Sequence, residues 1–362
     1  MPTISALDHY RLLGRSGMRV SPLALGTMTF GSDWGWGADD AQARQIFDAY
    51  VDHGGNFIDT AVNYTNGAAE RILGQLLKGK REQLVVSTKY TMARDPGNPN
   101  SGGNHRLNLT RSVETSLKQL DTDRIELLYL HAWDFTTSAE EVMRALDDLV
   151  RAGKVLYLGI CNTPAWKVAQ LQTLAELRGW SPLVALQIEY SLVERSVEHE
   201  LIPMARAMGL GVLPWSPLGG GILSGKYSRE DLNQASEAGV SPTRKGVISS
   251  SGHMTERSLE IAGVVSEIAA DIGVTASQVA LAWTLLNPAV VAPVMGARTL
   301  AQAQDNLQAL SLRLSDEQIA RLDQASAPEA IFPARFVSRP MVQQLIFGDA
   351  HESPGRLLHR SF

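Results

Sequence analysis

Short apolar segments recur along the chain, and stretches with helical spacing separate them. Each segment is rich in β-branched residues and too short for a buried helix, which is typical of a strand covered on both faces. Eight strands are predicted on this basis, at residues 22–31, 56–61, 83–90, 125–132, 155–162, 183–190, 210–220 and 290–297.

The intervening stretches place apolar residues three or four positions apart, as on one face of an amphipathic helix. Seven helices are predicted, at residues 41–51, 110–120, 138–150, 164–174, 198–208, 259–272 and 277–286. Ser138 and Glu141 have the spacing of a capping box at the start of the third. Pro164 stands in a first turn, where a missing N–H has no cost.

Alternating strands and helices predict a parallel sheet with right-handed crossovers. Eight such units favour an α/β protein of the (β/α)8 TIM-barrel class over an open doubly wound sheet. No linker divides the chain, so we expect one domain at 1–325 and a C-terminal tail at 326–362. Long loops at 91–108 and 225–256 follow the third and seventh strands, on the face where barrel enzymes build their sites.

Composition narrows the class of protein. Of the 362 residues, 44% are hydrophobic and 20% are charged, which excludes a disordered or fibrous chain. The net charge of −5 argues against a dedicated nucleic-acid binder. A single cysteine, Cys161, excludes a disulfide framework and fits a cytoplasmic location. No stretch approaches the ~20 apolar residues of a membrane span, so no membrane partner is expected. The eight histidines lack metal-ligand spacing, so no metal is expected.

Polar residues end three consecutive predicted strands: Asp59, Lys89 and His131. Tyr64 lies five positions beyond Asp59, and a barrel would point all four at one mouth. Taken singly, each has an ordinary structural explanation: helix capping for the aspartate, a satisfied core position for the histidine, packing for the tyrosine. A buried lysine without a partner is costly, and Asp59 on the adjacent strand is the obvious partner for Lys89.

Together these residues predict a proton donor. A free phenol titrates near ~10, and a nearby Lys89 ammonium should lower the pKa of Tyr64. Asp59 would hold Lys89 in place and keep it charged. His131 would donate a hydrogen bond to a carbonyl oxygen. This layout suits a reaction that develops an alkoxide, with Tyr64 as general acid.

Several motifs, in this order, resemble those of the aldo-keto reductase superfamily, over about Leu12 to Leu322. They are D-T-A-x-N-Y-x-x-G-x-x-E (59–70), V-S-T-K (86–89), L-H (130–131), Q-x-E-Y-S (187–191), W-S-P-L-G-G-G-x-L-x-G-K-Y (215–227) and G-A-R-T (296–299). The last two resemble the bacterial and potassium-channel β-subunit-like branch more than the aldose-reductase branch.

The resemblance implies a barrel that binds NADP(H) without a Rossmann domain. It implies Tyr64 as proton donor, Asp59 and Lys89 tuning it, and His131 orienting the carbonyl. Besides Asp59, it implies these cofactor contacts: Gly26, Thr27 and Met28 at the nicotinamide; Asn162 and Gln187 at its carboxamide; Trp215 under its ring; Ser216, Pro217, Leu218 and Gly219 along the pyrophosphate; Lys226 at the phosphates; Gly296, Arg298 and Gln302 at the adenosine 2′-phosphate; and Asp305 and Asn306 at the adenine.

Physical reasoning supports part of this assignment. The glycine run after Trp215 would let backbone N–H groups approach a pyrophosphate. Arg298 is a suitable anion fork, and no acidic residue lies within three positions of it, which favours NADP over NAD. Alternatively, Arg298 is a solvated residue at a helix start. Cys161 and Gln302 depart from the family pattern, in which many relatives carry serine and some arginine, respectively.

Aromatic residues cluster after the first and fourth strands: Trp34, Trp36, Trp133 and Phe135. They either line a substrate pocket for a bulky carbonyl, for which Trp34 and Trp133 are the candidates, or anchor the loops. The tail carries Phe332, Phe336 and Phe347 and either folds over the mouth or packs at an interface.

The leading hypothesis is NADPH-dependent, reversible reduction of an aldehyde or ketone to the alcohol, with a small carbonyl or alcohol compound as partner. One alternative is a cofactor-sensing regulatory protein with little turnover. Another is a barrel lyase or isomerase without nicotinamide. Both a monomer and a larger ring are compatible with the sequence.

Overall fold

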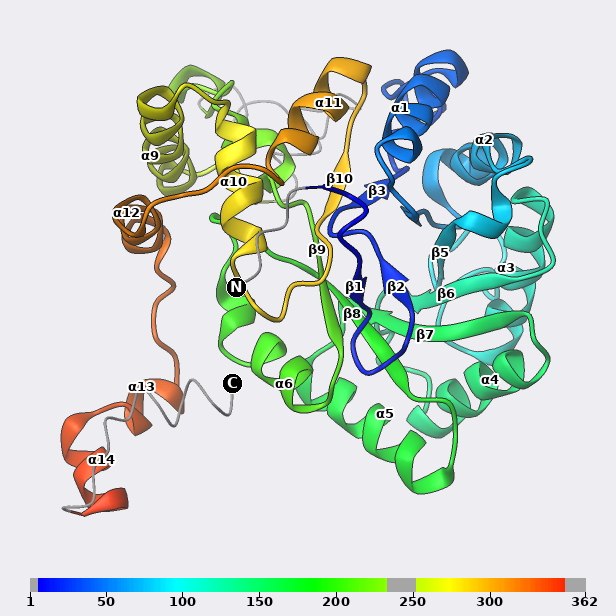
Figure 1. The fold of residues 1–362 in the computed structure, drawn as a ribbon. Coiled ribbons are helices and arrows are strands. Elements are labelled where there is room, and N and C mark those ends of the chain that lie inside the picture. Colours follow the sequence, from blue (N-terminus) through cyan, green and yellow to red (C-terminus); the bar gives the residue numbers. More distant parts are fainter. Residues whose placement is uncertain (1–5, 233–251, 349–362) are drawn as a thin grey trace.

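The computed structural model describes residues 6–232 and 252–348, and eight parallel strands form a nearly closed barrel in it (Figure 1). The order around the sheet is β10-β3-β4-β5-β6-β7-β8-β9, and Val212 of β9 pairs with Val290 just before β10, which joins the two edges. The strands are β3 (Ala24–Gly26), β4 (Phe57–Asp59), β5 (Val85–Tyr90), β6 (Ile125–Leu130), β7 (Val155–Cys161), β8 (Leu183–Glu189), β9 (Gly211–Trp215) and β10 (Val294–Gly296). The predicted (β/α)8 class and all eight predicted strands are confirmed.

Helices surround the barrel, and the seven predicted ones are present with shifted ends (Figure 1). They are α1 (Asp40–Asp52), α3 (Arg106–Gln119), α4 (Ala139–Arg151), α5 (Ala165–Arg178), α6 (Leu201–Ala207, preceded by the 3-10 turn η3, Ser196–Glu198), α9 (Glu256–Ile272) and α10 (Ala276–Leu285). Within the described residues, five further helices were not predicted: α2 (Ala68–Leu76), α11 (Leu300–Gln308), α12 (Asp316–Ser326) and, in the tail, α13 (Ala334–Val337) and α14 (Pro340–Phe347).

Helix α2 was not predicted because Gly74, a poor helix former, interrupts its apolar pattern. The structure explains this glycine: a Cβ at Gly74 would lie 2.6 Å from the Gln119 carbonyl oxygen, at the end of α3. The capping box predicted for α4 is half formed. Ser138 accepts a hydrogen bond from the Glu141 N–H, but the Glu141 carboxylate accepts from the Arg106 N–H at the start of α3.

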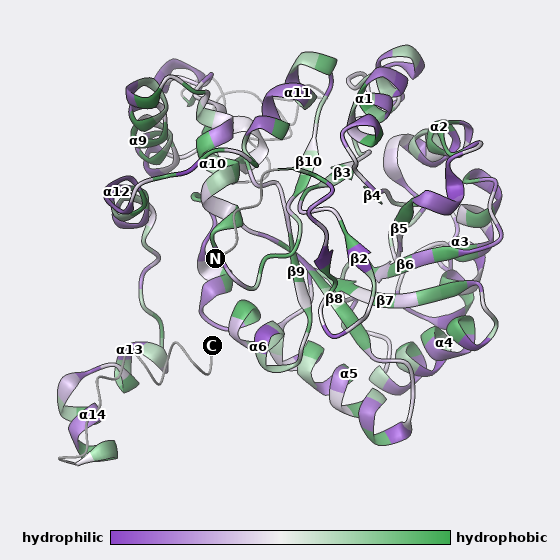
Figure 2. Cartoon of the chain, viewed as in Figure 1, coloured by the Kyte–Doolittle hydropathy of each residue, from purple (hydrophilic) through white to green (hydrophobic). Residues whose placement is uncertain are grey.

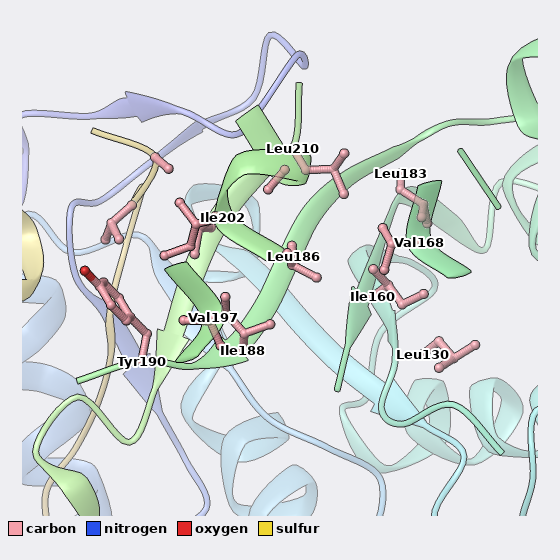
Figure 3. Packing of buried hydrophobic residues seen from close by; sticks show 14 of the residues in the cluster. Leu130, Ile160, Val168, Leu183, Leu186, Ile188, Tyr190, Val197, Ile202 and Leu210 are labelled. Carbon is pink, nitrogen blue, oxygen red and sulfur yellow. The ribbon is translucent and has the colours of Figure 1, made fainter. Parts of the chain in front are cut away.

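The core lies in two layers. Between sheet and helices, Figure 3 shows Ile188 of β8 beside Val197 and Ile160 of β7 near Val168 of α5, all within one buried cluster. Figure 2 shows helices α4 to α6 alternating between apolar and polar positions, as expected for helices with one buried face. Inside the barrel, Phe57 and Tyr129 fill the space between the strands.

The amino-terminal end of the barrel is closed by a hairpin of β1 (Arg11–Leu12) and β2 (Arg19–Val20). The Arg11 guanidinium donates to the Val290 and Val291 carbonyl oxygens, at 2.7 and 3.2 Å. Gly14 has φ +54°, and a Cβ there would lie 2.2 Å from the Val184 carbonyl oxygen, so the turn lies against the strands. Access to the barrel is therefore at the opposite, carboxyl end of the strands.

The described part of the tail lies apart from the barrel, where Figure 1 shows α13 (Ala334–Val337) and α14 (Pro340–Phe347). Phe332, Phe336 and Phe347 are 72%, 47% and 38% exposed, so they do not pack over the mouth. The rest of the tail, 349–362, and most of the loop predicted at 225–256 fall outside the described residues. The division at residue 325 stays a prediction. In the described ranges no helix has the length and apolar character needed to cross a bilayer.

Candidate active site

Four of the predicted residues meet at the carboxyl ends of β4, β5 and β6. The Lys89 ammonium donates to Asp59 Oδ2 at 2.5 Å and to the Thr60 carbonyl oxygen at 2.8 Å. Lys89 Nζ lies 4.9 Å from the centroid of the Tyr64 ring. The rings of Tyr64 and His131 are 5.9 Å apart and nearly perpendicular, at 77°. The expected juxtaposition, including the Asp59–Lys89 pair, is present.

The Asp59–Lys89 pair is buried, with side-chain exposures of 3% and 0%. Ser87 Oγ and Gln187 Nε2 donate to Asp59 Oδ1, at 2.8 and 2.9 Å, so both carboxylate oxygens are bound. Burial lowers the pKa of Lys89, but the Asp59 carboxylate, which accepts a hydrogen bond from the ammonium, outweighs burial and the net pKa is raised. Lys89 is therefore an ammonium at neutral pH.

The pKa of the Tyr64 phenol differs from the sequence-based expectation. Burial raises this pKa, and although the Lys89 charge lowers it as expected, the net value lies above 10.0. The predicted net decrease is therefore wrong for this structure, because burial disfavours the phenolate more than the ammonium stabilises it. The phenol is protonated at neutral pH and has a proton to give.

His131 presents a neutral imidazole. Burial and the Lys89 charge lower its pKa to about 3. Its Nδ1 is buried and has no hydrogen-bond partner among the described residues. The backbone is bound on both sides: the His131 N–H donates to Thr91 Oγ1 at 3.2 Å and to the Tyr90 carbonyl oxygen at 3.3 Å, and the His131 carbonyl oxygen accepts from Asn162 Nδ2 at 2.9 Å. A neutral imidazole can donate one N–H to a substrate oxygen.

The loops at this mouth hold unusual backbone. Six non-glycine residues with positive φ follow strand ends here: Thr65, Asn66, Thr91, Phe135, Asn162 and Ser216. Such conformations cost about 1–3 kcal/mol each and persist only where the surroundings fix them. Thr65, for example, donates to the Phe30 carbonyl oxygen at 2.7 Å and accepts from the Ala69 N–H at 3.0 Å. The residue after Tyr64 is thereby fixed.

The predicted nicotinamide contacts surround the quartet, by which we mean Asp59, Tyr64, Lys89 and His131. Gly26 pairs in register with Asp59, Met28 is 36% exposed, and Gln187 donates to Asp59. Trp215 Nε1 donates to Asn162 Oδ1 at 3.0 Å, so the Asn162 amide links Trp215 to the His131 carbonyl. These residues come from β3, β7, β8 and β9, and all lie at one end of the barrel.

The predicted pyrophosphate segment, Ser216 to Gly219, leads into the 3-10 turn η4 (Gly219–Ser224). Gly219, Gly220 and Gly221 all have positive φ. Their N–H groups donate to Ser216 O, Ser216 Oγ and Leu218 O, at 2.8, 2.7 and 2.9 Å. The glycines therefore use these donors to turn the chain, rather than leaving them free as expected. A Cβ at Gly221 would lie 3.1 Å from Lys226 Nζ, which places this cation beside the turn.

The predicted adenosine contacts lie around β10 and α11. Arg298 is half-buried, and its N–H donates to Gln302 Oε1 at 2.9 Å, so the Gln302 side chain is engaged at the helix start. Asp305 accepts from Thr275 Oγ1 and Gln278 Nε2, at 2.9 and 2.7 Å, which ties α11 to α10. Asn306 Nδ2 donates to the Gly296 carbonyl oxygen at 3.4 Å. Asp305 and Asn306 thus hold the helix in place, whatever further contacts they make.

The aromatic residues divide into two groups. The rings of Trp34 and Tyr64 are nearly perpendicular, with centroids 6.4 Å apart, and the ring of Trp36 lies 5.9 Å from that of Trp34. Phe135 is 70% exposed. Trp133 is only 7% exposed and belongs to the core cluster between sheet and helices, so it anchors its loop and does not line the mouth. Of the two pocket candidates, only Trp34 lies against the quartet.

The site suits a nicotinamide dinucleotide. The Thr27 hydroxyl is buried without a hydrogen-bond partner among the described residues, and the Thr27 N–H donates to the Asp59 carbonyl oxygen at 2.9 Å. An unsatisfied donor beside the quartet and two cations, Lys226 and Arg298, after β9 and β10 fit a ligand with a polar head and phosphates. Within residues 6–232 and 252–348, no group of three or more His, Cys, Asp and Glu side chains is arranged to hold a metal ion.

Comparison with known proteins gives a consistent result. The model of a family described as "Aldo/keto reductase family" matches residues 22–327. Norsolorinic acid reductase of Aspergillus flavus is 38% identical over 93% of this chain and 85% of its own length. The aldo-keto reductase ausK of Aspergillus calidoustus is 38% identical over 91% and 85% of the two chains. An aryl-alcohol dehydrogenase of Pestalotiopsis microspora is 35% identical over 93% and 87%. These relatives are fungal, so they give no support to the expected bacterial, potassium-channel β-subunit-like branch.

Proposed function

This chain belongs to the aldo/keto reductase family, and on that premise we propose that it reduces an aldehyde or ketone to the alcohol, reversibly and with NADPH. The observation that carries the proposal is the buried Asp59–Lys89 pair, 2.5 Å between its charged atoms, beneath a protonated Tyr64 and beside a neutral His131. NADPH, when bound, supplies the hydride.

The four side chains divide the remaining chemistry. His131 donates its N–H to the carbonyl oxygen, which orients and polarises the carbonyl. Tyr64 gives its phenolic proton to the same oxygen as negative charge develops there. Lys89 stabilises the phenolate that Tyr64 becomes, because its ammonium lies 4.9 Å from the ring. Asp59 holds Lys89 in place. In the alcohol-oxidising direction the proton returns to Tyr64.

The cofactor would lie across the mouth from the quartet to α11. We assign the nicotinamide end to Gly26, Thr27, Met28, Asp59, Asn162, Gln187 and Trp215, the phosphates to Ser216 through Gly219 and Lys226, and the adenosine end to Gly296, Arg298, Gln302, Asp305 and Asn306. The preference for NADP over NAD rests on Arg298, whose guanidinium can bind a 2′-phosphate with two parallel hydrogen bonds.

The substrate class we propose is an aryl aldehyde or ketone. Trp34, Trp36 and Tyr64 form a chain of ring contacts at the mouth, and Phe135 is exposed. Aromatic rings stack favourably on such surfaces. A relative named as an aryl-alcohol dehydrogenase supports the same class. The cytoplasmic location stays a prediction from the sequence, and so does the oligomeric state.

The test is the loss of near-ultraviolet nicotinamide absorbance when the purified protein is mixed with NADPH, or NADH, and a panel of aryl and alkyl carbonyls. We expect turnover with NADPH, faster on aryl substrates, that collapses in Tyr64→Phe. Tight NADPH binding without turnover on any carbonyl would support the cofactor-sensing alternative. No binding of either cofactor would contradict the proposal and favour a lyase or isomerase.

A further inference from the structure

Asn104, in the loop after β5, has a fully buried side chain, 0% exposed, that binds the loop after β6. Its Nδ2 donates to Thr91 Oγ1 and to the Ala132 carbonyl oxygen, both at 2.9 Å. Its Oδ1 accepts from the Asp134 N–H at 2.8 Å, and the Asn104 N–H donates to Asp134 Oδ2 at 2.7 Å. Every polar group of the Asn104 side chain is therefore bound: one bond, to Thr91, lies within its own loop, and two reach the loop after β6.

Asp134 is fixed as the charged partner of this link. Burial opposes its ionisation, but hydrogen bonds from the backbone of Asn104, from Thr137 and from Thr136 outweigh burial and lower its pKa to about 2. The Asp134 carboxylate also accepts from the Thr137 hydroxyl at 2.7 Å. The loop after β6 is thus bound to Asn104 through the Asp134 N–H and through the Asp134 carboxylate.

His131 lies in the middle of this anchored backbone. Its N–H is shared between the Tyr90 carbonyl oxygen of β5, at 3.3 Å, and Thr91 Oγ1, at 3.2 Å, the same oxygen that accepts from Asn104. The next carbonyl, that of Ala132, accepts the other Asn104 bond. The imidazole Nδ1 has no partner among the described residues. The orientation of the ring therefore depends on the backbone that carries it, and on contact with Tyr64.

We propose that Asn104 is a positioning residue, which holds the backbone of His131 so that the imidazole is aimed at the substrate carbonyl oxygen. The proposal rests on the proposed function. It also gives a role to part of the loop at 91–108, which we expected on the face where barrel enzymes build their sites: Asn104 in this loop supports the strand end that carries His131. A misplacement of about 1 Å in such a group can cost about 10²-fold in rate.

The test compares Asn104→Ala with Asn108→Ala. Asn108 is an equally buried amide of the same region, and its Nδ2 donates to the Thr91 and Gly103 carbonyl oxygens, at 3.3 and 2.8 Å, without touching the Thr91 hydroxyl or Ala132. We expect kcat to fall about 10–100-fold in Asn104→Ala, with KM for NADPH unchanged. Asn108→Ala should lose comparable thermal stability and keep kcat within about threefold.

A second readout does not depend on turnover. Histidine-selective ¹⁵N labelling reports the imidazole signals, and His131→Asn identifies those of His131 by their loss. We expect a single neutral tautomer in the wild type and in Asn108→Ala, and shifted or broadened His131 signals in Asn104→Ala. Unchanged His131 signals in Asn104→Ala would overturn the proposal, even if the protein reduced no carbonyl at all.

A third variant covers the case in which Asn104→Ala does not fold. Thr91→Val removes the one oxygen that connects Asn104 to the His131 N–H and keeps the side-chain shape. It should shift the His131 signals in the same direction and lower kcat with KM for NADPH unchanged. Wild-type signals and wild-type kcat in Thr91→Val would contradict the proposed link.

Discussion

The two ends of the candidate site are built differently. At the carboxyl ends of β4 to β6, Asp59 and Lys89 are almost fully buried and bound to fixed partners. Around the start of α11, Arg298 is half-buried and Gln302 is exposed. A buried, preorganised constellation needs no rearrangement when charge develops, whereas exposed charges act mainly when a ligand covers them. We infer that the chemistry is fixed by the fold and that the cofactor grip is completed by binding.

The largest effect should follow from removing the proton donor. Tyr64→Phe keeps the ring and its contacts with Trp34 and His131 but loses the phenolic proton. We expect kcat to fall about 10³-fold or more, within the range of general-acid catalysis, with NADPH still bound. Tyr50→Phe is the control. The Tyr50 hydroxyl donates to the Leu23 and Phe57 carbonyl oxygens, at the amino-terminal ends of β3 and β4, so its loss should lower stability and leave kcat unchanged. Equal kcat losses in both variants would contradict a special role for Tyr64.

The second-largest effect should follow from breaking the buried ion pair, and the quantity measured is the free energy of unfolding. Lys89→Met leaves the Asp59 carboxylate buried without its cation, which should cost about 3–5 kcal/mol of unfolding free energy. The control is Lys80→Met, because Lys80 and Asp48 form a pair at 2.9 Å with side-chain exposures of 35% and 39%, for which about 0–1 kcal/mol is expected. Urea unfolding measures both. Equal losses would show that the Asp59–Lys89 pair is no more than a surface contact.

A third change tests whether burial also shifts the pKa of a carboxyl group outside the quartet. Glu70 of α2 is fully buried; its Oε1 accepts from the Thr88 hydroxyl at 2.6 Å, and its Oε2 has no partner among the described residues. Burial raises its pKa from 4.5 to about 7. Well below pH 4.5 the carboxyl is protonated in both the folded and the unfolded state. As pH rises towards 7 the unfolded chain loses that proton first, so the folded state is progressively destabilised, by about 3 kcal/mol in total.

Glu70→Gln removes this titration. We expect the variant to gain up to about 3 kcal/mol relative to the wild type at pH 8 and only about 0.4 kcal/mol at pH 4.5. Chemical unfolding at a series of pH values measures the difference. A gain that is the same at both pH values would mean that Glu70 is not the titrating group.

The smallest effect should come from the exposed end of the site. Arg298→Ala should raise KM for NADPH about 10–100-fold, since a charge-assisted hydrogen bond contributes about 1.5–3 kcal/mol, and leave kcat and KM for NADH unchanged. Arg298→Lys keeps the charge but loses the two parallel donors of the guanidinium, so its KM for NADPH should lie between those of the wild type and Arg298→Ala. If KM for NADH rises as much as KM for NADPH, Arg298 does not bind a 2′-phosphate.

The barrel strands and the quartet could be predicted from the sequence for related reasons. Strands buried on both faces read as short apolar runs, and the carboxyl ends of parallel strands share one edge, so Asp59, Lys89 and His131 had to meet. Net effects of burial were less predictable. The effect of the Lys89 charge on the pKa of Tyr64 follows from their places at the ends of adjacent strands, but the larger effect of burial on that pKa depends on all the side chains that cover the phenol.

Side-chain partners from distant elements were not predictable. Trp133 is buried between sheet and helices, with Lys167 of α5 over its ring at 4.9 Å, and no local pattern shows this. Asp305 is held by Thr275 and Gln278 of another helix. Asn104 lies in a loop rich in glycine, asparagine and proline, and only the folded chain shows that its amide meets the strand end that carries His131.

The most direct test of the central claim, that the buried quartet protonates a carbonyl reduced by NADPH, follows deuterium. Wild type and Tyr64→Phe are each saturated with NADPH that is deuterated at the nicotinamide C4, on the face the enzyme uses, and mixed with an aryl aldehyde. NMR of the product then locates the label. We predict deuterium on the carbinol carbon with the wild type and almost none, at equal cofactor occupancy, with Tyr64→Phe. Wild-type protein that binds NADPH and transfers no deuterium, or Tyr64→Phe that transfers it at the wild-type rate, would contradict the claim.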